Sequence, residues 1–104
     1  MKPELIDAVW QRGRVMPEAD PQQWRQDECG AWIRREHFSR EDSDFGWKIE
    51  AVLPGAAQST EALRPFHWRN GYDVANRSLR RRITADRANV PAEKYATPPR
   101  NRSV

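Results

Sequence analysis

The chain of 104 residues contains a single cysteine and no long apolar run. Its one thiol, Cys29, excludes an internal disulfide and a zinc site built from several cysteines. Crossing a bilayer would take about 20 consecutive apolar residues, and no segment comes near that length. Residues 1–4 do not open a charged segment followed by a long apolar one, so we expect no signal peptide. These absences favour a soluble intracellular protein with a cytoplasmic location and no contact with membranes.

The composition that remains is polar and rich in proline. Mean hydropathy is −0.99 and eight residues are proline, so the hydrophobic core must be small. A chain of this length fits one domain, since domains typically contain about 100–150 residues. Five tryptophans and three phenylalanines are the natural components of that core, because each aromatic side chain buries a large apolar area.

The two halves of the chain carry opposite net charge. Residues 1–63 hold eight basic and twelve acidic side chains, whereas residues 64–104 hold ten basic and three acidic ones. Such asymmetry suggests a partner for the basic half, and nucleic acid is the usual candidate. The alternative is a solvated basic tail that keeps the protein soluble, and the charge pattern by itself does not decide between the two.

Local patterns in the first 30 residues predict helices. Apolar residues within 5–15 fit one helical face, although a short extended segment would also fit them. Asp20 followed by Pro21 is typical of a helix start, because aspartate caps free backbone amides and proline suits the first helical position. This second helix should be short, since Gly30 follows closely.

The middle of the chain favours strands, and its end favours a helix and a disordered tail. Residues 29–38 and 45–53 have strand-like patterns and would form a hairpin around the polar loop between them. A helix is expected over about 66–82. Beyond residue 83 the chain is polar and rich in proline, so we expect a largely disordered tail.

Three blocks of the sequence resemble a group of small bacterial HNH-like proteins, which have the ββα-metal fold. The blocks are Trp-Arg-Gln-Asp-Glu-Cys-Gly-Ala-Trp-Ile at 24–33, Ser-Asp-Phe-Gly-Trp-Lys-Ile at 43–49 and Leu-Arg-Pro-Phe-His-Trp-Arg-Asn at 63–70. The similarity runs from about residue 9 to residue 79, with the blocks in the same order and spacing. It implies a small α+β fold in which a β-hairpin packs on a helix.

The resemblance also implies where a nuclease site would lie. In HNH nucleases an acidic residue followed by histidine ends the second strand. The acidic residue binds a divalent metal and the histidine is the general base. An asparagine entering the helix holds that histidine, and a further asparagine or histidine on the helix binds the metal. These positions fall on Glu50, Ala51, Ala62 and Gly71.

Most of that chemistry is missing from the matched positions. Ala51 cannot accept a proton, Ala62 cannot hold such a base in place, and Gly71 offers no ligand. One carboxylate without a second positioned ligand makes a poor Mg²⁺ site, because that ion requires near-octahedral oxygen coordination. We therefore expect no metal, no cofactor and no enzymatic cleavage.

Glu50, His67 and Asn70 remain as polar groups near the expected site. A rewired site formed by these three is one hypothesis. The interpretation that we favour is structural: His67 packs or caps locally, and Glu50 is a solvated residue on the polar face of its strand. His37 is expected on the surface of the hairpin, and Cys29 is expected to pack as a small apolar group.

The expected C-terminal helix is strongly basic, with Asp73 as its only acidic residue. The arginines on this helix or just before it, which we expect to bind nucleic acid, are Arg64, Arg69, Arg77, Arg80, Arg81 and Arg82. Guanidinium groups suit phosphate oxygens, and such contacts bind nucleic acid without reading its sequence. The alternative is a solvated helix end, where positive charge is favourable beside the helix dipole.

These observations predict an N-terminal segment (1–19), a ββα domain (20–82) and a basic tail (83–104). The expected function is that of a catalytically inactive HNH-like protein that binds DNA or RNA without sequence preference. Two alternatives remain open. One is a protein-interaction module that uses tryptophan and arginine as anchors, and the other is a metal-dependent nuclease with unusual ligands.

Overall fold

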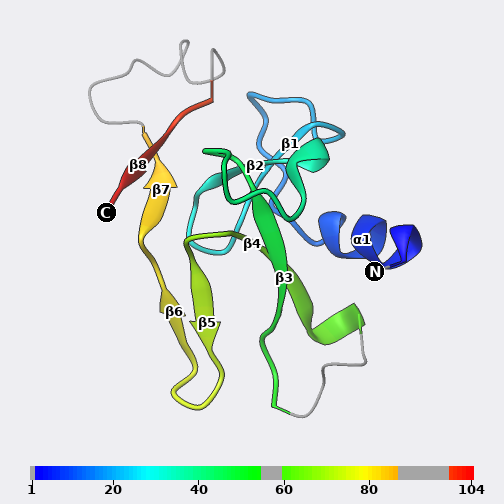
Figure 1. Ribbon diagram of the computed structural model, residues 1–104, viewed down its shortest axis with the longest axis vertical. Coiled ribbons are helices and arrows are strands. Elements are labelled where there is room, and N and C mark those ends of the chain that lie inside the picture. Colours follow the sequence, from blue (N-terminus) through cyan, green and yellow to red (C-terminus); the bar gives the residue numbers. More distant parts are fainter. Residues whose placement is uncertain (1, 55–59, 87–98) are drawn as a thin grey trace.

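The computed structural model describes residues 2–54, 60–86 and 99–104 (Figure 1). It contains one helix, α1 (Pro3–Trp10), and two single-turn 3-10 helices, η1 (Arg35–His37) and η2 (Thr60–Ala62). The strands are β1 (Trp24–Gln26), β2 (Trp32–Arg34), β3 (Trp47–Ala51), β4 (Leu63–His67), β5 (Gly71–Asp73), β6 (Ser78–Arg80), β7 (Ile83–Ala85) and β8 (Asn101–Ser103). This confirms the α+β class.

The strands pair as four separate antiparallel hairpins: β1–β2, β3–β4, β5–β6 and β7–β8. The β3–β4 pair is the longest, and its register runs from Trp47 opposite His67 to Ala51 opposite Leu63. In Figure 1 this pair crosses the centre of the molecule, with α1 on one side of it. The β5–β6 hairpin extends as an arm on the other side, and β7–β8 continues from that arm in the opposite direction.

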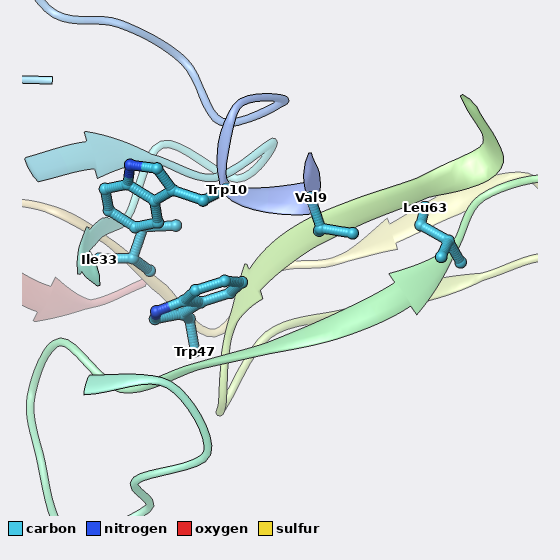
Figure 2. Close-up of a cluster of buried hydrophobic side chains, with 5 residues drawn as sticks. All are labelled: Val9, Trp10, Ile33, Trp47 and Leu63. Carbon is cyan, nitrogen blue, oxygen red and sulfur yellow. The ribbon is translucent and has the colours of Figure 1, made fainter. Parts of the chain in front are cut away.

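The core lies between α1 and the central hairpin. It contains Val9 and Trp10 from α1, Ile33 from β2, Trp47 from β3 and Leu63 from β4. Figure 2 shows Trp10, Ile33 and Trp47 grouped together, with Val9 and Leu63 further along the hairpin. The ring centroids of Trp10 and Trp47 are 5.4 Å apart. Three of the five tryptophans, Trp10, Trp32 and Trp47, are buried, as is Phe66 among the phenylalanines, so the prediction of an aromatic core is confirmed for these residues and not for all eight.

The N-terminal helix is also confirmed, over Pro3–Trp10. Proline occupies its first turn, where the missing N–H is tolerated. Apolar side chains at spacings of three and four residues place Val9 and Trp10 on the buried face.

The helix expected over 66–82 is wrong, because this stretch forms β4, β5 and β6 with a turn between the last two. The Asp73 carboxylate accepts hydrogen bonds from the backbone and the side-chain amide of Asn76, which closes the turn. Arg77 leaves the turn at φ 51°, which no helix permits. An aspartate that bonds the backbone locally competes with helix formation.

The expected hairpin between residues 29–38 and 45–53 is wrong as well. Strand β2 pairs with β1, and β3 pairs with β4, so the two predicted strands share only a single parallel bridge between Phe38 and Trp47. The strand–strand–helix order expected over 20–82 is therefore not the order that the structure shows.

The helix expected to start at Asp20 is a turn followed by β1. The Asp20 carboxylate accepts a hydrogen bond from the backbone of Gln22, two residues on, at 2.9 Å. Arg25 then fixes the extended path, because its guanidinium donates to the carbonyls of Pro21, Gln11 and Gly13. Aspartate starts turns and helices with the same kind of bond, so the local sequence does not distinguish them.

The disordered tail expected from residue 83 differs from the structure at both of its ends. Ile83–Ala85 and Asn101–Ser103 pair as β7 and β8, from Ile83 opposite Ser103 to Ala85 opposite Asn101. The part of this prediction that concerns residues 87–98 lies outside the described residues.

Candidate functional site

Glu50 and Gly71, two of the four matched nuclease positions, lie side by side. The Glu50 carboxylate accepts a hydrogen bond from the backbone of Tyr72 at 2.9 Å and pairs with Lys48 at 3.1 Å. A Cβ atom at Gly71 would stand 3.3 Å from a Glu50 oxygen, so glycine leaves room for this carboxylate. Glu50 is thus engaged in linking β3 to β5, and it is not solely a solvated strand residue.

The other two matched positions are apolar in their surroundings. Ala51 ends β3 and packs against the core, and Ala62 is buried in η2. The Ala62 carbonyl accepts a hydrogen bond from Val52 at 2.8 Å. Neither residue presents a polar side chain to the Glu50 carboxylate.

His67 and Asn70 gather elsewhere, around the carboxylate of Asp27. Asp27 is 1% exposed, in the turn between β1 and β2. One of its oxygens accepts hydrogen bonds from the backbone N–H groups of Cys29 and Ala31, both at 2.9 Å. The other oxygen accepts from the His67 backbone and the Asn70 side-chain amide, also at 2.9 Å each. This carboxylate therefore joins the β1–β2 turn to the end of β4.

Two opposing influences act on Asp27. Burial raises the pKa of the Asp27 carboxyl, and the four hydrogen bonds that it accepts favour the charged form and limit that rise. A buried carboxylate is tolerated when its oxygens are fully hydrogen-bonded, as they are here.

Asn70 extends the same network to β7. Its amide nitrogen donates to the Ile83 carbonyl at 3.0 Å as well as to Asp27. Its carbonyl oxygen accepts from the backbone of Arg82 and Ile83 at 2.8 and 2.9 Å. Both ends of the buried amide are satisfied, so Asn70 serves as a structural bridge between three chain segments.

The ring of His67 is held in its neutral form. Its Nδ1 accepts a hydrogen bond from the backbone of Arg69 at 3.1 Å, which leaves Nε2–H to donate to the Asp44 carbonyl at 2.8 Å. Burial lowers the pKa of His67, and nearby Asp27 and Asp44 oppose that effect. The side chain is 2% exposed and hydrogen-bonded at both nitrogens. This placement agrees with the structural interpretation of His67.

The neutral state of His67 predicts a loss of stability in mild acid. The unfolded chain takes up a proton as the pH falls below about 6.5, whereas folded His67, with its lowered pKa, resists protonation. The free energy of unfolding should therefore fall as the pH drops from about 7 to 5.5, by up to about 1.4 kcal/mol per pH unit per histidine. Urea titrations at several pH values measure this slope.

The second histidine must be separated from the first in that experiment. The pKa of His37 is also lowered, by partial burial and by the neighbouring charges of Arg40 and Arg34, so it contributes with the same sign. The slope should shrink in His67→Gln and persist in His37→Gln. An unchanged slope in His67→Gln would contradict the assignment to His67.

His37 and Cys29 have structural surroundings. His37 lies in η1, where its Nδ1 is 2.6 Å from the Ser43 hydroxyl, rather than on the surface of a hairpin. Cys29 is buried, as expected, and burial beside Asp27 raises the pKa of its thiol to about 12. A thiol with that pKa is a poor nucleophile at neutral pH.

The six arginines predicted to bind nucleic acid fall into two groups. Arg64 is half-buried, donates to the carbonyls of Glu61 and Leu63, and lies 3.8 Å from Glu28. The other five are exposed, and they lie before, within and after the β5–β6 arm: Arg69, Arg77, Arg80, Arg81 and Arg82. The structure therefore places two of the six, Arg77 and Arg80, within the arm and three directly beside it, and it removes Arg64 from the set.

A small pocket opens beside the base of this arm. Its volume is about 210 Å³. It is lined by Asp44, His67, Trp68, Arg69, Ile83, Asn101, Arg102 and Ser103. Six of the eight lining residues belong to residues 67–69, from the end of β4 into the β4–β5 link, and to β8, which are more than 30 residues apart in sequence; Asp44 precedes β3 and Ile83 begins β7. Asn101 holds β8 in place by bonding both the N–H and the carbonyl of Trp32.

The residues that organise this region were not predicted from the sequence. Asp27 precedes Gly30, which has a φ of +84°, and an aspartate followed by such a glycine indicates a turn. Nothing local indicates that its second oxygen meets residues 40 and 43 positions further on. Asn101 lies in the segment expected to be disordered, and it carried no sequence signal at all.

Comparisons with protein-family models, with curated protein sequences and with solved structures found no match to this chain. Among the described residues, no group of three or more histidine, cysteine, aspartate or glutamate side chains is arranged to hold a metal ion. In the same part of the chain, no helix has the length and apolar character that crossing a membrane requires.

Proposed function

We propose that the protein binds nucleic acid through the β5–β6 arm and does not cut it. The observation that carries the proposal is the exposure of five arginines on and directly beside this arm, Arg69, Arg77, Arg80, Arg81 and Arg82, against one acidic residue, Asp73. The Asp73 carboxylate already accepts a hydrogen bond from the side-chain amide of Asn76, and it lies 3.9 Å from the Arg80 guanidinium. Exposed guanidinium groups of this density favour phosphate backbones.

The same proposal includes the loss of cutting. Ala51 stands at the position matched to the general base. The Glu50 carboxylate accepts a hydrogen bond from the backbone of Tyr72 and forms an ion pair with Lys48. His67 and Asn70 are both bonded to Asp27, so these polar groups do not meet Glu50 at one site. The kinship with HNH-like proteins is part of this proposal as well, and its support is the three sequence blocks rather than the order of the elements.

The test is the binding of fluorescently labelled oligonucleotides, followed by anisotropy over a range of salt concentrations. We expect micromolar affinity at low salt and a steep fall with added salt, because phosphate contacts release counterions. Arg80→Ala/Arg81→Ala should weaken binding to every sequence tested. It should also reduce the slope of log K against log salt by ~1.4 for a single strand, about 0.7 per lost contact.

A matched control removes the same charge from the opposite side of the molecule. Lys2→Ala/Arg12→Ala deletes two exposed basic side chains at the ends of α1. This variant should bind as the unaltered protein does. Absence of binding at low salt, or equal weakening by both double variants, would overturn the arm as the binding surface. Nicking of a plasmid with Mg²⁺ or Mn²⁺ that Glu50→Gln abolishes would overturn the loss of cutting.

A further inference from the structure

We propose that the pocket beside Trp68 takes one nucleotide of a single strand, with its base against the indole and its phosphate between Arg69 and Arg102. The inference rests on the proposed function and specifies its ligand: single-stranded nucleic acid in preference to a duplex. Three features of the pocket support it, namely a fixed aromatic ring, two available guanidinium groups and a size suited to one small planar group.

The indole of Trp68 is fixed before any ligand arrives. Its Nε1–H donates to the Ser43 carbonyl at 2.8 Å. The ring stacks on His67, with centroids 5.9 Å apart and an interplanar angle of 23°. His67 is itself held at both ring nitrogens. A ring that is already ordered loses little conformational freedom on binding, and nucleobases stack on such rings whatever their sequence.

Two arginines from distant parts of the chain border this ring. The Arg69 guanidinium carbon lies over the Trp68 ring, 5.9 Å from its centroid, so this exposed side chain moves aside for the base, and Arg102 comes from β8. Both side chains are exposed, and within the described residues neither forms an ion pair with a carboxylate. Asp44 adds one negative charge to the lining, and neutral His67 adds none. The two guanidinium groups therefore leave the pocket positive.

The small pocket and the single aromatic ring favour a single strand over a duplex. Sites for drug-sized ligands occupy about 300–1,000 Å³, so a pocket of about 210 Å³ suits a group as small as one base. A base in a duplex has both faces covered by its neighbours and cannot stack on Trp68 without being flipped out. A single strand presents its bases freely, so one of them can stack on the indole without being flipped out of a duplex.

The experiment compares a labelled oligodeoxythymidine with a duplex of equal length, using the full chain. We expect the single strand to bind about tenfold more tightly than the duplex. Arg102→Ala should weaken binding of the single strand several-fold and leave the duplex unchanged, whereas Arg12→Ala, which removes the same charge on the far side, should affect neither. Thermal unfolding of each variant checks that the fold is retained.

A second readout locates the base without a substitution. An oligodeoxythymidine carrying 5-iodouracil is photocrosslinked to the unaltered protein, and mass spectrometry identifies the modified peptide. Crosslinking at Trp68 supports the proposal. Crosslinking confined to the β5–β6 arm overturns it.

The outcomes separate this inference from the proposed function. If neither oligonucleotide binds, both the nucleotide site and the proposed function are overturned. A different result is that the strand and the duplex bind equally, with binding lowered by Arg80→Ala/Arg81→Ala and not by Arg102→Ala. That result overturns the nucleotide site in the pocket and retains the arm as the binding surface. Competition by inorganic phosphate as effective as by the strand means that the arginines bind phosphate alone, which also overturns the nucleotide site. Equal competition by polyglutamate overturns it in favour of an acidic peptide.

Discussion

Replacing Asp27 by asparagine is expected to lower the free energy of unfolding by about 2–4 kcal/mol. Each carboxylate oxygen of Asp27 accepts two hydrogen bonds, from Cys29 and Ala31 on one side and from His67 and Asn70 on the other. An amide nitrogen in place of either oxygen would leave two buried N–H groups without an acceptor. For a chain of this size the loss corresponds to a fall in Tm of roughly 10–25 °C, which calorimetry or urea titration measures.

The neighbouring Glu28 offers a matched control. It is only half-buried, and its ion pairs with Arg14 and Arg64 are both long, at 3.8 Å. Glu28→Gln removes the same charge one residue away and should change stability by less than about 1 kcal/mol. If the two variants unfold at the same temperature or urea concentration, the hydrogen bonds of Asp27 do not stabilise the fold more than the ion pairs of Glu28 do.

Replacing Trp10 by alanine is expected to destabilise the protein by about 3–5 kcal/mol. Trp10 is fully buried, packs on Trp47 at 5.4 Å and donates its indole N–H to the Pro21 carbonyl at 3.1 Å. Helix α1 is only eight residues long. A helix of that length depends on tertiary packing, so its detachment should accompany the loss. Urea titration measures the destabilisation, and far-ultraviolet circular dichroism measures the loss of helix.

The control for the core variant is an apolar side chain that does not join the core. Leu53 is 55% exposed, and Leu53→Ala should change stability by less than about 0.5 kcal/mol. Retention of the native helical signal in Trp10→Ala, with unchanged stability, would contradict the anchoring of α1 by this residue.

The Asp27 network and the pocket are parts of one arrangement. Asp27 fixes the backbone at His67, and Asn70 continues the connection to Ile83, which is itself part of the pocket lining. The ring of His67 in turn supports Trp68. Stability and binding should therefore be lost together when Asp27 is changed, whereas Arg102→Ala should affect binding alone.

The elements that were predicted correctly are those with strong local signals. The helix at residues 3–10 has proline at its start and apolar residues at helical spacing. The strand around Trp47 has alternating aromatic and branched residues. In both cases the pattern along the chain matches the side chain's final environment, because the buried face of a short element is set by its own periodicity.

Most of the failed predictions concern which segments pair with one another. The pairing of β3 with β4 and the closing of β7 on β8 depend on contacts between segments that are separated in sequence. The turn at residues 74–77 is local, but aspartate starts turns and helices with the same kind of hydrogen bond. A basic stretch such as residues 77–82 has almost no apolar pattern, so its sequence is compatible with a solvated helix and with an exposed strand. Tertiary context overrides weak propensity in such stretches.

The sequence by itself determined the aromatic composition of the core, the basic character of the second half and the alanine at position 51, and it favoured the N-terminal helix without excluding an extended segment. Each of these follows from residue identity or from spacing within one segment. Only the tertiary structure decided that the arginine-rich stretch is an arm of strands, that Arg64 is withdrawn from it, and that Asp27 draws His67 and Asn70 away from Glu50. The last of these outcomes depends on which donors meet a buried carboxylate across 40 residues of chain, and no local pattern encodes that choice.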